Sequence, residues 1–385
     1  MDRLFTPRFL VMCAFSFTVF MSLFQLLPTA PYHVIDLGGS TTVAGLFLAL
    51  LTYASALAAP FTGHIGDRYG QRHVLMTVSL MLAGLFALYA WLDSYHWLLV
   101  LVVLHGVVWS ALLTASGAYM TGTIPIARRA EGLGYWGLAS IFAIAAAPPI
   151  GFWVYRFGWR MLCLEGVVLN LVLALIAWRL PDDPVQPDAA HHLPAHGGGS
   201  RLHRLLDVRA LVLSITLGLV SFSYGAITSF SAMFAESIGA SPRTIVLTMA
   251  AITIVVVRVG IGRHLDRIGH RQALLPALAC AALGLLLVPL ARGTVSLAIA
   301  AVVFGAGFGL LFPAFTAYLL THVAGTRRGA AYGAMIAAFD TGIGTGSWSI
   351  GWLIQRVGFR PAFGLAAVLA CLALPYFLFV EKRVR

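Results

Sequence analysis

The sequence predicts an all-α integral membrane protein in which twelve transmembrane helices form two six-helix bundles related by a parallel repeat. Of the 385 residues, 60% are hydrophobic and only 10% are charged, whereas a soluble domain carries about 25% charged residues. Apolar stretches recur along the chain, most of them near the ~20 residues that a helix needs to cross ~30 Å of hydrocarbon. A short motif also appears twice, 199 positions apart, which indicates two related halves.

The spans can be placed in order along the chain, and their continuous apolarity favours helices over a β-barrel. They are residues 8–30, 41–62, 74–92, 97–121, 133–155, 161–180, 208–230, 243–262, 273–291, 294–320, 331–354 and 360–380. The first span follows Arg3 and Arg8, as the apolar part of a signal peptide would. It is too long for one and no small-residue cleavage site follows it, so we expect it to stay in the protein.

Residues 181–207 interrupt this pattern and are expected to form a cytoplasmic linker between the halves 1–180 and 208–385. Pro181 and Pro184 end the sixth span, and three glycines at 197–199 keep the segment loose. The linker contains four histidines: His191, His192, His196 and His203. Metal sensing stays open as an alternative for them, although a flexible polar tract more often binds nothing specific.

The basic residues indicate the orientation. With an even number of spans, both termini share one side of the membrane. Eighteen of the 25 Lys and Arg residues fall on that side, six fall on the other, and Arg258 lies inside a span. The positive-inside rule therefore places both termini in the cytoplasm, with the protein in the cytoplasmic (inner) membrane. The basic residues account for the net charge of +11 but form no groove-sized patch, so nucleic acid is not an expected partner.

The four cysteines fall in or at apolar spans and lie far apart in the sequence: Cys13, Cys163, Cys280 and Cys371. They have neither metal-ligand spacing nor a disulfide pattern, and small buried side chains are the expected role. We expect no metal and no cofactor.

The repeated motif follows spans 2 and 8 and keeps five residue types at the same spacing. The first copy contains Gly63, Asp67, Arg68, Gly70 and Arg72, and the second contains Gly262, Asp266, Arg267, Gly269 and Arg271. On these residues the whole chain resembles the major facilitator superfamily. The resemblance implies two bundles that rock about a central cavity. It also implies that Asp67 faces the N-terminus of span 11 and Asp266 that of span 5, latching the outward-facing state, so these are conformational residues.

Spans 4 and 5 bear on the direction of transport. Span 5 ends in Ala147-Pro-Pro-Ile-Gly-Phe152, which resembles a motif of the antiporter branch. Pro148 and Gly151 match that motif, and their physical role is a kink and a close helix interface. This favours export, and the segment after Leu27 is similar to arabinose-efflux-permease-like exporters. In span 4, however, Val102 stands where drug:proton antiporters have an arginine.

Three residues are candidates for proton coupling. Asp340 lies about nine residues into span 11. An ionised carboxylate at this depth is costly, so the group must be protonated, paired with a cation or in contact with water in a cavity. It is expected to carry a proton, and structural bracing is the alternative. Arg258 can pair with Asp340 or an anionic ligand group, although snorkelling or structural pairing is the more frequent role. His105 can change charge near neutral pH, and a structural histidine is its alternative. Span 1 lacks the acid of many proton-coupled relatives, and Gln25 is its most polar mid-depth residue.

The resemblance implies that spans 1, 4, 7 and 10 contact the substrate. Their mid-depth side chains are Gln25, His105, Trp109, Ser116, Tyr224, Phe304 and Phe312. This mixture suits a small amphipathic or aromatic molecule, although each aromatic side chain taken alone is more often a packing residue.

The expected function is secondary active transport. The first hypothesis is export of a small organic molecule (a drug, a metabolite or a metal chelator) by alternating access in exchange for protons. The alternative is a proton-coupled importer or a uniporter of a small polar metabolite. An enzyme is not expected, because Gly305-x-Gly-x-Gly309 lies in an apolar helix and suits close helix packing better than nucleotide binding. The expected partners are the small molecule, protons and membrane lipid, and the chain is expected to be a monomer.

Overall fold

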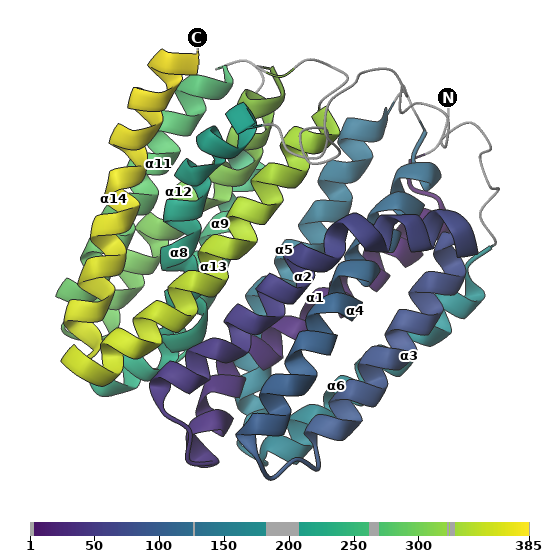
Figure 1. Ribbon diagram of the computed structural model, residues 1–385, viewed down its shortest axis with the longest axis horizontal. Coiled ribbons are helices and arrows are strands. Elements are labelled where there is room, and N and C mark those ends of the chain that lie inside the picture. Colours follow the sequence, from purple (N-terminus) through teal and green to yellow (C-terminus); the bar gives the residue numbers. More distant parts are fainter. Residues whose placement is uncertain are drawn as a thin grey trace.

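The computed structural model describes residues 4–125, 128–181, 208–261, 269–321, 323 and 328–384. Within these ranges the chain forms twelve helices, which Figure 1 shows as two bundles side by side. The first bundle contains α1 (Pro7–Asp36), α2 (Thr41–Tyr69), α3 (Gln71–Tyr89), α4 (Tyr95–Thr123), α5 (Arg129–Tyr155) and α6 (Trp159–Arg179). The second contains α8 (Val208–Ser237), α9 (Ile245–Ile261), α11 (His270–Leu290), α12 (Thr294–Thr321), α13 (Arg328–Val357) and α14 (Phe359–Val384).

Each of the twelve expected spans overlaps one of these helices, so the predicted fold class is confirmed. Among the described residues, ten helices are long and apolar enough to cross a membrane, and Ile245–Gly260 of α9 is a shorter apolar helix. The expected linker, apart from residue 181, lies outside the described residues.

Local sequence explains where several helices begin. The side chain of Thr6 accepts a hydrogen bond from the backbone N–H of Phe9 ahead of α1, and Ser40 caps α2 in the same way through Val43. Such side chains satisfy backbone donors that have no partner within the helix.

Glycines make the tight turns between consecutive helices, and they do so at equivalent positions of the two halves. Gly70 and Gly269, 199 residues apart, have φ values of 80° and 92°. Gly158 and Gly358, 200 residues apart, have φ values of 103° and 82°. Only glycine adopts this conformation without a steric penalty. The repeated motif glycine is therefore a backbone requirement of the turns after α2 and before α11.

Both chain termini lie at one end of the bundles, at the top of Figure 1, which we call the terminal end. The opposite end carries the turns around residues 37–40, 156–158, 238–244 and 358. There the first half of α2 packs against the second half of α13. The hydroxyl of Thr41 donates to the carbonyl of Gly351 at 2.8 Å, and the hydroxyl of Ser347 donates to the carbonyl of Gly45 at 2.9 Å. We call this the closed end.

The closed end also has a polar layer between the bundles. The hydroxyl of Tyr32 in α1 donates to Glu236 of α8 at 2.8 Å, and Arg243 pairs with the same carboxylate at 2.9 Å. The guanidinium of Arg243 lies 4.4 Å from the ring centre of Phe152 in α5. These contacts join α1 and α5 of the first bundle to the second bundle.

Candidate functional site

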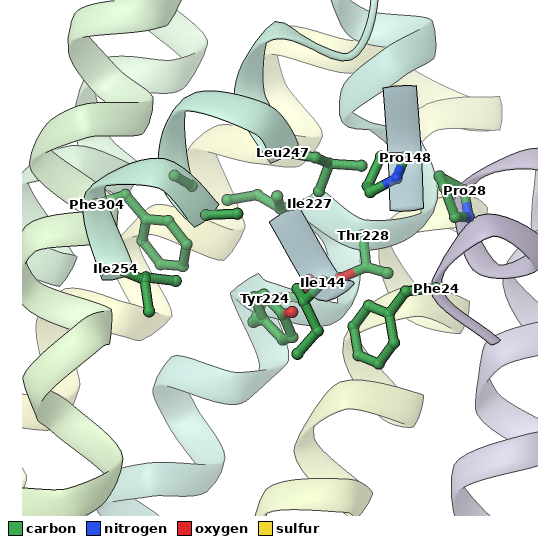
Figure 2. A pocket seen from close by; sticks show the side chains of 12 residues that line it. Phe24, Pro28, Ile144, Pro148, Tyr224, Ile227, Thr228, Leu247, Ile254 and Phe304 are labelled. Atoms are coloured by element: carbon green, nitrogen blue, oxygen red, sulfur yellow. Dashed lines mark hydrogen bonds between the residues drawn. The ribbon is translucent and has the colours of Figure 1, made fainter. Parts of the chain in front are cut away.

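A small cavity lies between the two bundles, close to the polar layer of the closed end. Figure 2 shows side chains from both bundles gathered around it. Its volume is about 30 Å³, which is room for one or two water molecules. It is lined by Phe24, Pro28, Ile144 and Pro148 of the first bundle and by Tyr224, Ile227, Thr228, Leu247, Ala250, Ala251, Ile254 and Phe304 of the second.

The lining is apolar apart from two side chains of α8. The hydroxyl of Thr228 already donates to the backbone carbonyl of Tyr224 at 2.9 Å. The ring of Tyr224 stacks on Phe308 with a centroid distance of 4.6 Å, and Phe304 stacks on Tyr224 at 6.4 Å. The cavity can therefore offer flat apolar contacts and few hydrogen bonds.

The row of rings continues beyond the cavity lining. In the second bundle, Phe339 lies 6.3 Å from Phe308, and Phe312 lies 5.5 Å from Phe339. Phe312 is thus joined to the cavity through other rings and is not one of the lining residues. In the first bundle, the ring of Phe20 lies between Phe24 and Trp109, at 5.8 and 5.6 Å.

Of the seven residues expected to contact the substrate, the structure brings Tyr224 and Phe304 into the lining. Phe312 and Trp109 form outer members of the aromatic rows, and Ser116 is buried but does not line the cavity. Gln25 and His105 face other helices.

His105 lies inside the first bundle, where it is 1% exposed. Its Nδ1 atom lies 3.3 Å from the hydroxyl of Tyr89 in α3, and its ring stacks on that of Tyr89. The Tyr89 carbonyl in turn accepts from the indole of Trp159. This arrangement corresponds to the structural alternative for His105, because the side chain bridges α4 to α3 and not to the cavity.

Gln25 also faces away from the cavity. Its amide Nε2 donates to Oε1 of Glu165 in α6 at 3.2 Å. Glu165 lies near the start of the expected span 161–180, and the sequence pattern offers no partner for it. The two residues are 140 positions apart, so no local pattern could have paired them.

Asp340 lies in the middle of α13 and is partly exposed. No hydrogen bond or ion pair joins it to another residue of the described ranges. One turn further along α13, a side chain on Gly344 would meet Thr52 and Tyr53 of α2. Asp340 therefore lies on the side of α13 that faces the other bundle, one turn nearer the terminal end than that contact.

Arg258 does not pair with Asp340. Its Nε donates to the backbone carbonyl of Gly309 in α12 at 2.9 Å. The contact joins α9 to α12, which is the structural role given above as the alternative. A Cβ on Gly309 would lie 3.2 Å from Cα of Ile254, so these two helices pack closely at this point.

Comparison with known proteins identifies the family. The sequence model described as Major Facilitator Superfamily matches residues 9–319 and again 213–385. The chain belongs to the Major Facilitator Superfamily. It is therefore a multi-pass membrane transporter of a small molecule, as the resemblance implied.

Relatives within this superfamily cover nearly the whole chain. The MFS-type transporter YhhS of Escherichia coli K12 is 24% identical over 385 residues, covering 98% of this chain and 93% of the relative. The MFS-type transporter PA14_38730 of Pseudomonas aeruginosa UCBPP-PA14 is 28% identical over 360 residues, covering 91% and 87%. Among solved structures, the nucleoside transporter NupG superposes with a TM-score of 0.78 at 16% identity, covering 98% of this chain and 100% of that one. At that identity the structural likeness supports the fold alone.

The superfamily motif is only partly described. Gly262, Asp266 and Arg267 lie outside the described residues, as do the side chain of Asp67 and the surroundings of Gly63. The latch implied for the two aspartates therefore stays a prediction.

The last arginine of each motif copy ties its turn to the final helix of its own bundle. Arg72 donates to the carbonyl of Trp178 in α6 at 2.7 Å. Arg271 donates to the carboxylate of Glu381 in α14 at 2.8 Å. Arg68, by contrast, lies over the ring of the neighbouring Tyr69 at 5.5 Å. The two halves thus repeat one anchoring contact within each bundle.

The span-5 motif joins the cavity to α1. Pro148 belongs to the cavity lining. A Cβ on Gly151 would lie 2.9 Å from Cβ of Gln25 and 3.0 Å from its Cα. A glycine at 151 therefore allows α5 to approach α1 at the level of Gln25.

Proposed function

We propose that this transporter exports a small amphipathic or aromatic organic molecule from the cytoplasm by alternating access in exchange for protons. The observation that carries the proposal is the cavity between the bundles, whose walls are aromatic and aliphatic and which is sealed on the side of the closed end.

The orientation of the protein in the membrane determines which side the closed end faces. Most basic residues lie on the side of the termini, so the positive-inside rule supports a cytoplasmic terminal end. The closed end then faces outward, and the conformation is inward-facing. A cargo molecule enters from the cytoplasm, and the contacts of Tyr32, Glu236 and Arg243 must separate before it can leave.

The lining argues for the class of cargo. A sugar or a nucleoside would bury several hydroxyl groups, and each unpaired one costs about 1–3 kcal/mol. The lining supplies polar side chains only at Tyr224 and Thr228. Stacked rings at Tyr224 and Phe304 favour a flat apolar surface instead. At about 30 Å³ the cavity must widen around the cargo as the bundles move.

Asp340 is the proposed proton carrier of the second bundle. It lies within the span, faces the first bundle, and lacks a partner among the described residues. Proton binding removes a charge that is costly at this depth. Because α13 forms the closed-end contact with α2, a change of charge at Asp340 biases the equilibrium between the two states.

The test is mass spectrometry of cells and medium from strains that express the intact protein, Asp340→Asn or Asp93→Asn. Asp93 is a carboxylate in the turn before α4 and serves as the matched control. We expect a compound that accumulates in the medium with the intact protein and the Asp93 variant and not with the Asp340 variant. Accumulation inside the cells would favour the importer alternative. Undiminished transport driven by a pH gradient in Asp340→Asn would exclude Asp340 as the carrier.

A further inference from the structure

A second intramembrane carboxyl group lies in the first bundle, away from the cavity and from Asp340. Glu165 of α6 meets Gln25 of α1, and one turn away Asn170 of α6 donates to the hydroxyl of Ser22 at 2.7 Å. Gln25 is 3% exposed and Asn170 is fully buried. Apart from Ser22, the surrounding side chains are apolar: Leu26, Phe86, Leu162 and Leu169.

Two oxygen atoms of this pair have no hydrogen-bond partner among the described residues. Gln25 Nε2 donates to Glu165 Oε1. The other oxygen of each group, Gln25 Oε1 and Glu165 Oε2, is buried and has no partner. Both atoms are acceptors when the carboxyl is ionised, so an ionised Glu165 leaves two buried acceptors unsatisfied, each at a cost of about 1–3 kcal/mol.

One added proton provides the donor that the two unpaired oxygen atoms lack. A proton on Glu165 Oε2 turns that atom into a donor, and the amide oxygen of Gln25 is the acceptor available on the same partner. A carboxylic acid and a primary amide can then share two hydrogen bonds. A single proton is taken up or released, and no other bond is made or broken.

No other titratable group of the packed helices takes over this role. The candidates nearest the closed end are Tyr89 of α3, Tyr155 of α5, and Tyr32 and His33 of α1. Tyr89 is bonded to His105, Tyr155 to Asp36 and Tyr32 to Glu236, while His33 stacks on Trp159. On α6 itself, Arg160 lies over Trp91, and Cys163 is buried. None of them hydrogen-bonds Glu165 in the described structure.

The pair is mechanically connected to the cavity wall. Gln25 lies against Gly151 of α5, and Phe24 and Pro28, on the same helix as Gln25, line the cavity together with Pro148 of α5. Loss of the proton would set two acceptor oxygens against each other and favour separation of α1 from α6. Such a shift displaces the α1–α5 contact that forms one side of the cavity.

We propose that Glu165 is a proton-binding site of the first bundle and that Gln25 holds its protonated form, so that this pair and Asp340 place one coupling carboxyl in each bundle. The role in coupling rests on the proposed proton exchange. The site itself is a separate claim, because proton binding can be measured without any cargo.

Infrared difference spectroscopy of the purified full-length protein tests the site. Between mildly acidic and mildly alkaline pH, we expect the intact protein to lose two carbonyl bands of protonated carboxyl groups, one from Glu165 and one from Asp340. Glu165→Gln should lack only the first band and Asp340→Asn only the second, and melting temperatures should verify that both variants are folded. Gln25→Leu should keep the Glu165 band but shift it to a frequency typical of a carboxyl without the amide partner.

Three results would overturn the site. Identical spectra for the intact protein and folded Glu165→Gln would place no titrating proton on Glu165. Loss of every such band in Asp340→Asn, with none lost in Glu165→Gln, would assign the proton to Asp340 alone. Loss of the Glu165 band on adding sodium chloride at constant pH would assign the oxygen atoms to a sodium ion. If the Glu165 band is present but the cargo flux does not depend on a pH gradient, the proton-binding site is supported and the proposed proton exchange is wrong.

Discussion

Replacing Gly45 by alanine should force the closed end apart. Gly45 of α2 faces the backbone of α13, and a Cβ there would lie 2.9 Å from the carbonyl carbon of Ser347 and 3.0 Å from Cα of Trp348, with the Ser347 oxygen closer still. Carbon atoms in contact are about 3.5–4.0 Å apart. The helices must therefore separate by roughly 0.5–1 Å. No side-chain rotation relieves the clash, because both neighbours are backbone atoms.

The size of the effect follows from overpacking, which costs about 1–3 kcal/mol. The penalty applies only where α2 and α13 touch at this end, so it raises the free energy of the inward-facing state relative to the alternative. A difference of about 1–3 kcal/mol corresponds to about a 5–150-fold change in the equilibrium.

The labelling rate of Leu247→Cys by a membrane-impermeant maleimide measures this equilibrium. Leu247 lines the cavity, and the four native cysteines are first replaced. In right-side-out vesicles, Gly45→Ala should raise the labelling rate by the same factor. Gly84→Ala is the control, because a Cβ at Gly84 of α3 meets nothing within 4 Å. Equal labelling of both variants, with unchanged melting temperatures, would refute the reasoning.

Further predictions concern the polar layer of the closed end, the contact of Arg271 with Glu381, and helix packing. Arg243→Gln should raise the rate of maleimide labelling at most about fivefold, since the ion pair with Glu236 is partly exposed and such pairs contribute about 0.2–1 kcal/mol. A hundredfold increase would show that this ion pair contributes far more than an exposed pair does. Glu381→Gln should lower stability by about 1.5–3 kcal/mol, because its carboxylate, 4% exposed, accepts from Arg271; an unchanged melting temperature would show that the anchor contributes nothing. Gly307→Ala should destabilise the protein by about 1–3 kcal/mol, because a Cβ there would lie 2.5 Å from the carbonyl of Ala277 and 2.9 Å from Cα of Ala281. A stable, unaltered Gly307→Ala protein would argue against close packing as the reason for this glycine.

The candidate site was predicted unevenly. Tyr224 and Phe304 were chosen as mid-depth residues, and both line the cavity. Gln25 and His105 were chosen on the same criterion, yet they contact α6 and α3. Depth in the membrane follows from position along an apolar span. The direction in which a side chain points depends on the rotation of its helix within the bundle, which these nearly uniformly apolar helices do not reveal.

The sequence by itself determined that the protein lies in a membrane, how many helices it has, and that it consists of two equivalent halves. Those features depend on composition, span length and a repeat at 199 positions, all of which are properties of the chain read in order. It also determined that Asp340 is a deep acidic residue. The tertiary structure alone decided that Glu165 meets Gln25, that Arg258 meets Gly309, and that the bundles touch through α2 and α13 at the end away from the termini. These contacts join residues from 51 to 310 positions apart. Helix packing selects them through shape and the placement of small residues, and no local pattern in the sequence records which helix lies opposite.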